Sequence, residues 1–223
     1  MRKVGIIVAM EKEYYGLLGK EHWGKDETNT GIPFSILVSG IGKVNAAVAA
    51  YHLCRQRVTD ILSFGCAGSA REEIGVGTVV VGTSFLYGDV WCGIPNAVGQ
   101  VQGEPPVFRS LNSKWRKIAG DYTEGTISTS DTLVDTKFLA QSILVSNPSA
   151  EPVAFDMESA AIAQVCHHFG ANFCSIRVIS DCPLTGNGAK QYADFWERKD
   201  ETMKSIFDNF MNYDYEEDKI FSY

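Results

Sequence analysis

The sequence predicts an α/β fold, a three-layer α/β/α sandwich around a central, mixed and twisted sheet. Apolar segments of strand length alternate with segments whose apolar residues recur at helical spacing, which is typical of this fold class. Several strand-like segments are apolar throughout, as expected when both faces of a sheet are covered. Gly and Pro punctuate the chain without forming a linker or an internal repeat, so residues 1–223 are predicted to form a single domain.

The predicted strands are short runs rich in β-branched residues. They span residues 4–9, 34–38, 60–64, 76–83, 125–129, 152–155 and 173–179. The predicted helices carry apolar residues at helical spacing. They span residues 44–55, 114–119, 136–144 and 158–169, with a long closing helix over 190–212. Ligands of α/β sheets bind in loops beyond the carboxyl ends of strands, so functional residues are expected in 10–14, 39–43, 65–70, 157–159 and 180–182.

Charge and apolar run length exclude two classes of partner. Lys and Arg number 20 against 27 Asp and Glu, giving a net charge of −7, and an acidic protein repels the phosphates of nucleic acids. The longest apolar runs, such as residues 78–83, are much shorter than the roughly 20 residues of a membrane-spanning helix. We therefore expect neither nucleic acid nor membrane as a partner.

The chain start and the cysteines indicate a cytoplasmic protein. The apolar run over residues 4–9 is too short for the core of a signal peptide and is rich in β-branched residues. The six cysteines include no CxxC pair, so neither a zinc ribbon nor a thioredoxin-like site is indicated, and reduced thiols are expected. No metal or organic cofactor is predicted.

Two glycine-containing turns follow predicted strands. The segment SGIGK at 39–43 lacks the first glycine of a phosphate-binding loop, and Val44 stands where the Ser or Thr ligand of Mg²⁺ would be. No GxGxxG follows the first strand. The small residues at 65–70 would let the main chain approach a flat ligand, although a tight turn explains them equally well.

Acidic residues stand at three of the predicted strand ends. Glu11 and Glu13 follow the first strand, Asp156 and Glu158 lie at the start of a helix, and Asp181 follows the longest apolar strand. Each could be a helix cap or complement a helix dipole. Together they would converge at one edge of the sheet, and paired carboxylates are the groups that glycosyl transfer uses.

Four ordered motifs carry a family resemblance. The segments GIIVAMEKE (5–13), SGIGKVNAA (39–47), DMESAAIA (156–163) and RVISD (177–181) resemble the 5′-methylthioadenosine/S-adenosylhomocysteine nucleosidases of the nucleoside phosphorylase superfamily. The resemblance implies a nucleoside phosphorylase-like fold and cleavage of an N-glycosidic bond. Asp181 would protonate purine N7, Glu13 would activate a water, and Glu158 would bind the ribose hydroxyls. The other implied substrate contacts are Met157, Ile41, Ala67, Gly68, Cys66, Leu133, Val134, Phe155 and Ser180.

The chain departs from the family pattern at several positions. Leu133 stands where a Phe often stacks on adenine, and Cys66 stands where a small hydroxyl residue is usual. In the family, the loop that corresponds to 87–91 and the following segment pack against a partner subunit. Trp91 and the PPVF run at 105–108 are suitable apolar anchors for a homodimer interface, although packing within one subunit is equally consistent.

The predicted activity is hydrolysis of a purine nucleoside, 5′-methylthioadenosine or S-adenosylhomocysteine, to adenine and a 5-substituted ribose. Related phosphorylases bind phosphate with arginines, whereas this chain has Glu11 and Glu13 at one of those regions and Ser63 and Phe64 at the other. Two carboxylates would repel a phosphate dianion, although Arg71 complicates this argument. The alternatives are a phosphorylase, a nucleosidase for another purine nucleoside or nucleotide, and a non-catalytic nucleoside-binding protein. The resemblance also implies a role in methionine salvage.

Overall fold

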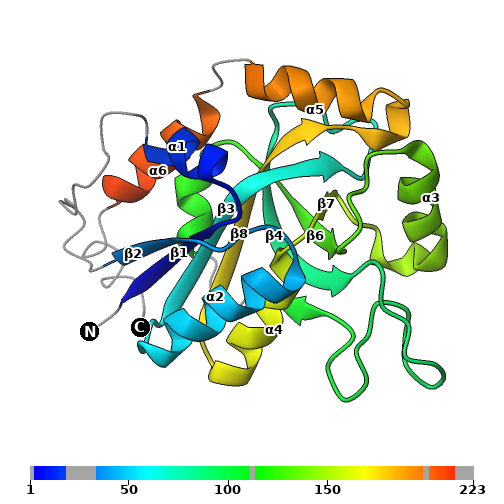
Figure 1. The fold of residues 1–223 in the computed structure, drawn as a ribbon, viewed down its shortest axis with the longest axis horizontal. Coiled ribbons are helices and arrows are strands. Elements are labelled where there is room, and N and C mark those ends of the chain that lie inside the picture. The colour runs from blue at the N-terminus through cyan, green and yellow to red at the C-terminus, as the bar shows by residue number, and fades with distance from the viewer. Residues whose placement is uncertain (1–2, 19–33, 111–113, 198–200, 214–223) are drawn as a thin grey trace.

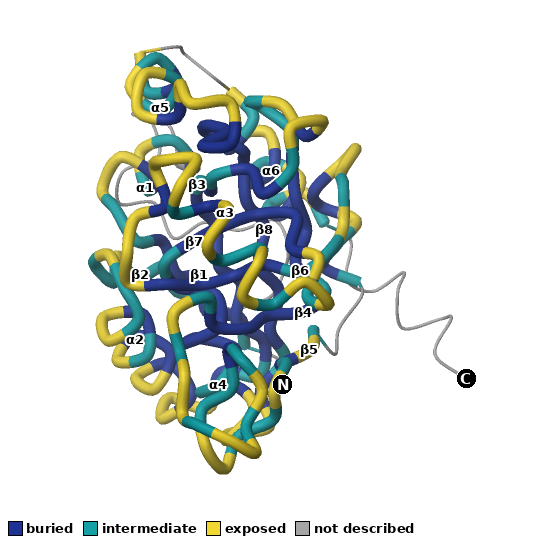
Figure 2. Tube along the Cα trace, turned by 90° about the vertical axis from the view of Figure 1, so that its right-hand side faces the viewer, coloured by how far each residue is buried: buried dark blue, intermediate teal, exposed yellow. Residues whose placement is uncertain are grey.

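The computed structural model describes residues 3–18, 34–110, 114–197 and 201–213. Within these ranges a mixed sheet lies between helices on its two faces (Figure 1). This arrangement confirms the predicted three-layer sandwich. The view turned by 90° shows buried chain along the strands and exposed chain on the surrounding helices and loops (Figure 2).

The elements follow one another in strand–helix alternation along most of the chain. The strands are β1 (Val4–Val8), β2 (Phe34–Val38), β3 (Asp60–Ser69), β4 (Val79–Tyr87), β5 (Phe108–Arg109), β6 (Thr123–Thr129), β7 (Ala154–Asp156) and β8 (Asn172–Asp181). The α-helices are α1 (Glu11–Leu18), α2 (Lys43–Arg55), α3 (Lys137–Ser146), α4 (Ser159–Phe169), α5 (Gly188–Glu197) and α6 (Thr202–Met211). The 3₁₀-helices are η1 (Lys114–Ala119), η2 (Pro148–Ala150) and η3 (Pro183–Thr185).

The sheet closes on itself. Strand β3 pairs with β8, β8 with β4, β4 with β6, β6 with β7, and β7 with β3, while β1 and β2 extend the sheet from β3. The β3–β7 and β4–β8 pairs are antiparallel and the other pairs of the ring are parallel. Register shifts interrupt β3 at Ala67/Gly68 and β4 at Gly82/Ser84. Such irregularities bend strands, and neither they nor the closure of the sheet are evident from the sequence pattern.

Two hydrophobic clusters hold helices against the sheet. The first cluster contains Ala46 and Ala50 of α2 and Ala160 and Ala163 of α4. These small side chains let α2 and α4 pack together on one face of the sheet (Figure 1). The second cluster joins η1 and α6 to the strands and includes the fully buried Phe210. Burial of apolar area at roughly 25 cal/mol per Å² supplies the driving force on both faces.

Several element boundaries differ from the predicted ones. The predicted closing helix over 190–212 is two helices, α5 and α6, and Glu201 belongs to neither. The segment after β1, predicted as a loop, begins α1 at Glu11. Strand β3 continues to Ser69 through the segment predicted as a glycine turn, and residues 114–119 are a 3₁₀-helix. Apolar periodicity does not detect the α5–α6 interruption, because both helices carry apolar residues that continue the pattern.

Three further features of the described residues are the state of the cysteines, the character of the helices and the grouping of side chains that could bind a metal. All six cysteines are free thiols, of which Cys54, Cys166, Cys174 and Cys182 are buried and Cys92 is exposed. The helices in the described ranges include none with the length and apolar character that a membrane crossing needs. Those same ranges contain no group of three His, Cys, Asp or Glu side chains arranged to hold a metal ion.

Candidate active site

A cavity of about 300 Å³ opens where β1, β3, β7 and β8 end, within the usual size range of small-molecule sites. All twelve residues that the sequence assigns to the site line it: Glu13, Ile41, Cys66, Ala67, Gly68, Leu133, Val134, Phe155, Met157, Glu158, Ser180 and Asp181. Four further residues line it: Met10, from a segment expected to carry functional residues, Asp156, one of the acidic residues expected to converge there, and Ala9 and Tyr192, which the sequence did not indicate. The structure therefore brings the predicted residues together, while their chemical roles stay predictions.

Glu13 lies in the first turn of α1 and turns back toward the end of β1. Its Oε2 accepts hydrogen bonds from the backbone N–H groups of Ala9 (2.9 Å) and Met10 (3.0 Å). Its Oε1 accepts one from the N–H of Cys66 on β3, also at 3.0 Å. Burial raises the pKa of Glu13, while nearby Arg177 and the three N–H groups lower it, and the net pKa lies above its usual value. The carboxyl group is thus held rigidly, with a proton affinity tuned by opposing effects.

The approach of Glu13 to β3 depends on a glycine. A Cβ at position 65 would stand 2.7 Å from Glu13 Oε1, a distance that real Cβ contacts do not show. Gly65 therefore allows the carboxylate to lie against the strand. The Sγ of the neighbouring Cys66 lies 3.6 Å from the same oxygen, and burial, followed by the charge of Glu13, raises the pKa of this thiol well above its usual value.

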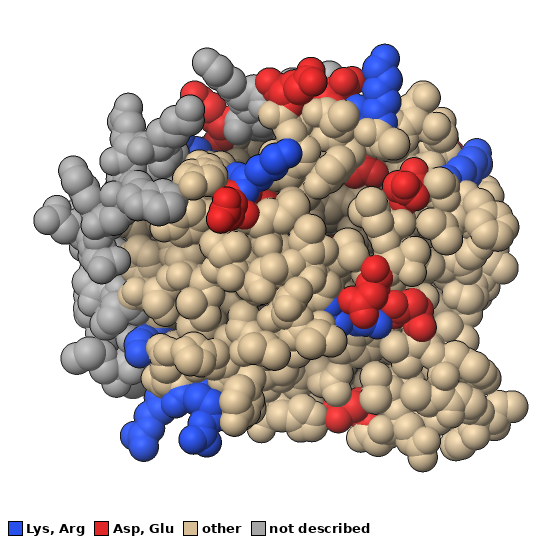
Figure 3. Space-filling model, in the orientation of Figure 1, with Lys and Arg blue, Asp and Glu red and all other residues tan. Residues whose placement is uncertain are grey.

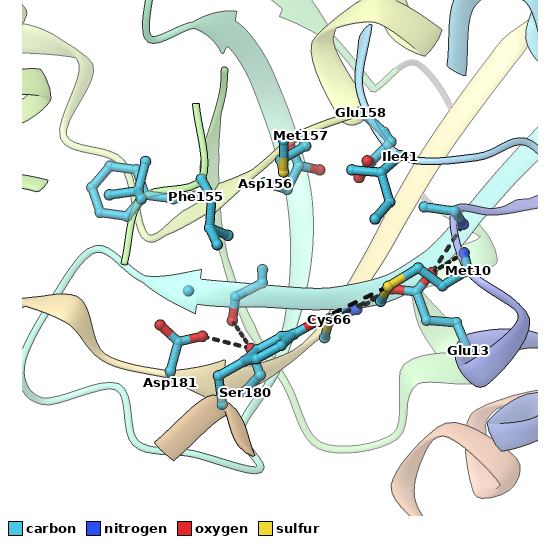
Figure 4. Close-up of a pocket in the computed structure, with 16 residues that line it drawn as sticks. Met10, Glu13, Ile41, Cys66, Phe155, Asp156, Met157, Glu158, Ser180 and Asp181 are labelled. Carbon is cyan, nitrogen blue, oxygen red and sulfur yellow. Dashed lines mark hydrogen bonds between the residues drawn. The ribbon is translucent and has the colours of Figure 1, made fainter. Parts of the chain in front are cut away.

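Glu158 lies immediately before α4, where the chain leaves β7. Its Oε1 accepts a hydrogen bond from the N–H of Gly42, 3.0 Å away in the turn before α2. Burial, followed by the charge of Asp156, raises the pKa of Glu158 to about 7, against the lowering effects of Arg177 and the Gly42 N–H. Figure 4 shows Glu158 beside Ile41 and across the cavity from Glu13 and Cys66.

Asp181 ends β8 at another side of the same cavity (Figure 4). Its Oδ1 lies 2.7 Å from the hydroxyl of Ser180, which also lies 3.2 Å from the carbonyl oxygen of Ala67. Its Oδ2 faces Gly68 and Gly188, where a Cβ would stand 3.4 Å away. Burial raises the pKa of Asp181 above its usual value, and the Ser180 hydrogen bond opposes that rise. This carboxyl group is therefore biased toward its protonated form.

An unpredicted ion pair joins Asp156, which lines the cavity, to a buried arginine that does not line it. Arg177 on β8 is fully buried, and its Nη2 lies 3.0 Å from Asp156 Oδ2. Arg177 also donates to Ser63 Oγ at 3.0 Å, while Asp156 accepts from the Thr129 hydroxyl at 2.6 Å. Arg177 is the buried positive charge that lowers the pKa of both Glu13 and Glu158. The sequence signal is Arg177, the single cation of a strand rich in apolar residues, since a buried arginine requires carboxylate partners.

The remaining walls are mostly apolar. Phe155, Val134 and Leu133 line the cavity, and Leu133 is 57% exposed. Tyr192 of α5 lines the cavity as well, with its hydroxyl 4.0 Å from the Sδ of Met10. A flat, apolar ligand with a few polar atoms matches these walls.

The structure also answers the question that Arg71 raises. Its Nη2 donates to the carbonyl oxygen of Glu151 at 3.0 Å and its Nε to that of Pro152 at 3.4 Å. Arg71 does not line the cavity, and neither does any lysine or other arginine of the described residues. The described cavity lining is therefore rich in carboxyl groups and poor in cations.

Comparison with known proteins matches this geometry to a family. The family model described as "Phosphorylase superfamily" matches residues 3–212. A 5′-methylthioadenosine/S-adenosylhomocysteine nucleosidase of Shewanella halifaxensis is 32% identical over 199 residues, which cover 80% of this chain and 86% of that protein. This chain belongs to the 5′-methylthioadenosine/S-adenosylhomocysteine nucleosidase family of the phosphorylase superfamily.

Solved structures of the nucleosidase family have the same fold. The nucleosidase of Neisseria meningitidis, in complex with methylthio-immucillin-A, superposes with a TM-score of 0.81 at 28% identity, covering 96% of this chain and all of that one. The nucleosidase of S. pneumoniae, with a transition-state inhibitor, has a TM-score of 0.80 at 26% identity, covering 94% of this chain and 98% of that one. The nucleoside phosphorylase-like fold implied by the sequence is therefore confirmed.

The four motifs that carry the nucleosidase resemblance all contribute to the cavity. The first supplies Glu13, the second Ile41, the third Glu158 and the fourth Asp181. They come from chain positions up to 168 residues apart (181 − 13). The parallel strands β1, β3 and β8 bring Glu13 and Asp181 to one edge of the sheet, and β7, which is antiparallel to β3, brings Glu158 to the same cavity. The departures from the family pattern, Cys66 and Leu133, line the cavity too.

Proposed function

We propose that this chain hydrolyses the N-glycosidic bond of 5′-methylthioadenosine and S-adenosylhomocysteine, releasing adenine and a 5-substituted ribose. The observation that carries the proposal is the arrangement of Glu13, Glu158 and Asp181 around one nucleoside-sized cavity. The names of the nucleosidase relatives and the nucleoside analogues in their structures support it. Cleavage through an oxocarbenium-like transition state needs an acid for the leaving group and a base for water.

Asp181 is the proposed general acid. A purine leaves most easily as a neutral molecule, so a proton or a strong hydrogen bond must reach its N7. Burial raises the pKa of Asp181 above its usual value, which makes the protonated form more accessible than for an exposed aspartate, and Oδ2 faces glycines that leave room for a ligand. A positioned acid of this kind contributes typically ~10²- to 10⁴-fold to a rate.

Glu13 is the proposed general base for the attacking water. The three N–H groups that bind its oxygens favour the ionised form, while burial makes that carboxylate more basic than usual. A base must be ionised before it can accept a proton, and its efficiency rises with basicity. The Glu13 carboxylate also stabilises the positive charge that develops on the sugar, because a fixed charge in a dry site acts more strongly than one in water.

Glu158 is the proposed ligand of the ribose hydroxyls. It faces the cavity across from Glu13 (Figure 4), and one of its oxygens is occupied by the Gly42 N–H. A carboxylate has further acceptor sites, which are free to accept hydrogen bonds from the two vicinal hydroxyls. The adenine ring would then lie between Phe155, Val134 and Leu133, in reach of Asp181.

Water is favoured over phosphate as the nucleophile. Phosphate binding requires cations, and the described cavity lining holds none. Glu13 would repel a phosphate dianion by roughly 1–4 kcal/mol at contact distance. A purely binding protein would have no use for a buried carboxylate beside the expected water position. We therefore rank hydrolysis above phosphorolysis and above simple binding.

An assay of product identity tests the proposal. The protein is incubated with methylthioadenosine, with and without phosphate, while adenine and the sugar product are followed by chromatography. The expected result is adenine release at equal rates in both mixtures, with S-adenosylhomocysteine also cleaved. A ribose 1-phosphate product would assign the chain to the phosphorylases. Binding without product would make it a nucleoside-binding protein, and cleavage of other purine nucleosides alone would change the substrate.

We further propose a homodimer. Val44, Val48 and Tyr51 form an exposed apolar stripe along α2, and Trp91 is 60% exposed in the loop after β4. The surface over α2 carries few charged side chains (Figure 3). Phe108, at the end of the segment 105–108, packs in the hydrophobic core of its own subunit. It is therefore not an anchor for a partner subunit. Light scattering tests the proposal, with Val48→Lys expected to give monomers and Thr123→Lys, on β6, serving as control.

The proposed setting is the cytoplasm, with a role in methionine salvage. Six free thiols support a reducing compartment, and salvage follows from the proposed substrate, which retains the sulfur of methionine. Fractionation of the source cells and growth on methylthioadenosine as sulfur source test the two proposals. Secretion, or unchanged growth after gene deletion, would contradict them.

A further inference from the structure

An ionic cluster lies beside the cavity without lining it. The Nζ of Lys43 lies 2.9 Å from Asp89 Oδ1 and 3.5 Å from Asp131 Oδ2. The N–H of Asp131 also donates to Asp89 Oδ2 at 2.9 Å. The three residues follow β2, β4 and β6 respectively, so the cluster ties together three segments at one edge of the sheet. A lysine in the first turn of a helix opposes the helix dipole, and the two aspartates offset its charge.

The cluster reaches the cavity through the N-terminus of α2. Gly42 is the N-cap of α2, with φ +96°, and no side chain caps the helix locally. Instead, two carboxylates from distant segments accept consecutive backbone hydrogen bonds. The Gly42 N–H donates to Glu158 at 3.0 Å, and the Lys43 N–H donates to Asp131 Oδ1 at 2.8 Å. Because these N–H groups belong to adjacent peptide planes, the position of one restricts the other.

We infer that Asp131 is a positioning residue for Glu158. Held by Lys43 and Asp89, Asp131 fixes the start of α2 so that the Gly42 N–H meets the Glu158 carboxylate. It thereby favours the ionised, correctly oriented form of Glu158. A Cβ on Gly42 would stand 3.1 Å from Asp131 Oδ1, so Asp131 packs closely against the backbone of Gly42. The catalytic consequence rests on the proposed function, whereas the effect on Glu158 itself does not.

The decisive measurement is the pKa of Glu158 in the variant Asp131→Ala. It is followed by NMR titration of ¹³C-labelled carboxyl groups, with the Glu158 signal assigned from its loss in Glu158→Gln. The Gly42 N–H lowers the pKa of Glu158, so its displacement should raise that pKa by roughly half a unit or more. Direct removal of the Asp131 charge would act in the opposite direction, because it removes a negative neighbour. An unchanged or lowered pKa would overturn the inference.

A matched control separates positioning from the loss of a surface ion pair. Glu124 has the same exposed fraction of its side chain as Asp131, 53%, and pairs with Arg116 at 2.8 Å away from the cavity. Glu124→Ala should leave the pKa of Glu158 unchanged. Asp131→Asn retains an acceptor for the Lys43 N–H and should therefore shift that pKa less than Asp131→Ala does.

Kinetics supply a second, independent test. Asp131→Ala should raise KM for methylthioadenosine about three- to tenfold with little change in kcat, as expected from a weakened hydrogen bond to the ribose-binding group. In a Glu158→Gln background, Asp131→Ala should lower kcat/KM little further, because the effects of two residues that act through one another are not additive. Additive losses in kcat/KM would contradict the inference. If the wild-type chain releases no adenine, the proposed function fails, and the NMR titration still decides the positioning.

Discussion

Arg177 lies fully buried with its Nη2 3.0 Å from Oδ2 of Asp156, a residue that lines the cavity. Burial alone would lower the pKa of Arg177, but Asp156, Glu158 and Glu13 raise it above its usual value. One arginine thus serves three carboxyl groups, two of which face the cavity with raised pKa values. This relationship lets a site rich in acids fold without leaving several uncompensated charges in a dry interior.

Loss of this arginine should be costly. Arg177→Met leaves Asp156 buried without its ion-pair partner, and breaking a buried pair from one side costs about 3–5 kcal/mol of the free energy of unfolding. Urea denaturation followed by circular dichroism measures the change. Arg116→Met, which removes a more exposed ion pair with Glu124, should cost less than about 1 kcal/mol. Equal effects of the two substitutions would contradict the buried role of Arg177.

Glu158 should make stability depend on pH with a definite sign. Its pKa is about 7 in the folded chain against an ordinary value of 4.5, so the unfolded chain loses this proton first as pH rises. Between these two values the folded state binds more protons, and this contribution to stability falls as pH rises, by about 2–3 kcal/mol in total. Unfolding at pH 4.5 and 7.5 measures it. Glu158→Gln should reduce the fall, and an identical pH dependence in the variant would refute the assignment.

Asp181→Asn should separate chemistry from binding. The amide keeps the size of the side chain but cannot supply the proton, so adenine release should fall ~10²- to 10⁴-fold while nucleoside affinity changes little. In the wild type, kcat/KM should fall as pH rises through the raised pKa of Asp181, because the protonated form is the active one. Single-turnover experiments measure the rate of adenine release, and calorimetric titration measures the nucleoside affinity. A variant that retains its rate would remove Asp181 from the acid role.

Leu133→Phe should strengthen binding of the base. Leu133 is 57% exposed and lines the cavity together with Phe155 and Val134. An aromatic ring there could stack on adenine, and such pairs contribute about 0.5–1.5 kcal/mol, equivalent to a roughly two- to tenfold lower KM. Initial rates over a range of methylthioadenosine concentrations give this number. A higher KM would mean that the base lies elsewhere in the cavity.

The site residues that directly follow apolar strands could be predicted from the sequence, because the local pattern shows where a strand ends. Glu13 and Asp181 stand after apolar strands that run parallel, and the ends of such strands meet at one edge of the sheet. Glu158 also follows an apolar strand, but β7 is antiparallel to β3, so this rule alone does not place it. Helix α1, which carries Glu13, escaped prediction because Tyr14, Tyr15 and Gly16 lower helix propensity. Its form depends on packing against α6, where a Cβ on Gly16 would stand 3.3 Å from Met203 Sδ.

Features that depend on distant pairing were beyond prediction. The ring of strands closes through β7, which has three residues and pairs with both β3 and β6, and so short a strand carries no pairing signal. Tyr192 reaches the cavity only because the predicted closing helix is interrupted and α5 packs beside β8. The partnership of Arg177 with Asp156 likewise joins side chains from different elements, so only the presence of a buried cation could be inferred.

The close approach of Glu13 to β3 gives a prediction with a matched control. In Gly65→Ala the new methyl group would stand 2.7 Å from Glu13 Oε1 and 3.4 Å from Arg177 Nη1, so the carboxylate must move from the N–H groups that bind it. Adenine release should fall at least tenfold, because small displacements of a catalytic group are costly, and stability should fall by about 1–3 kcal/mol.

Gly75→Ala, in the connection between β3 and β4, is the control. A Cβ at position 75 meets no atom within 4 Å, and Gly75 does not adopt a positive φ. Replacing such a glycine by alanine restricts the unfolded chain and should leave stability unchanged or slightly raised, by up to about 1 kcal/mol, with normal activity. Thermal unfolding and the rate of adenine release are measured for Gly65→Ala and Gly75→Ala in parallel. The comparison separates the effect of a steric clash at position 65 from that of an added methyl group in open space at position 75. Normal activity in Gly65→Ala would show that Glu13 need not touch β3 for catalysis, and would move the search for the base to another carboxyl group of the cavity.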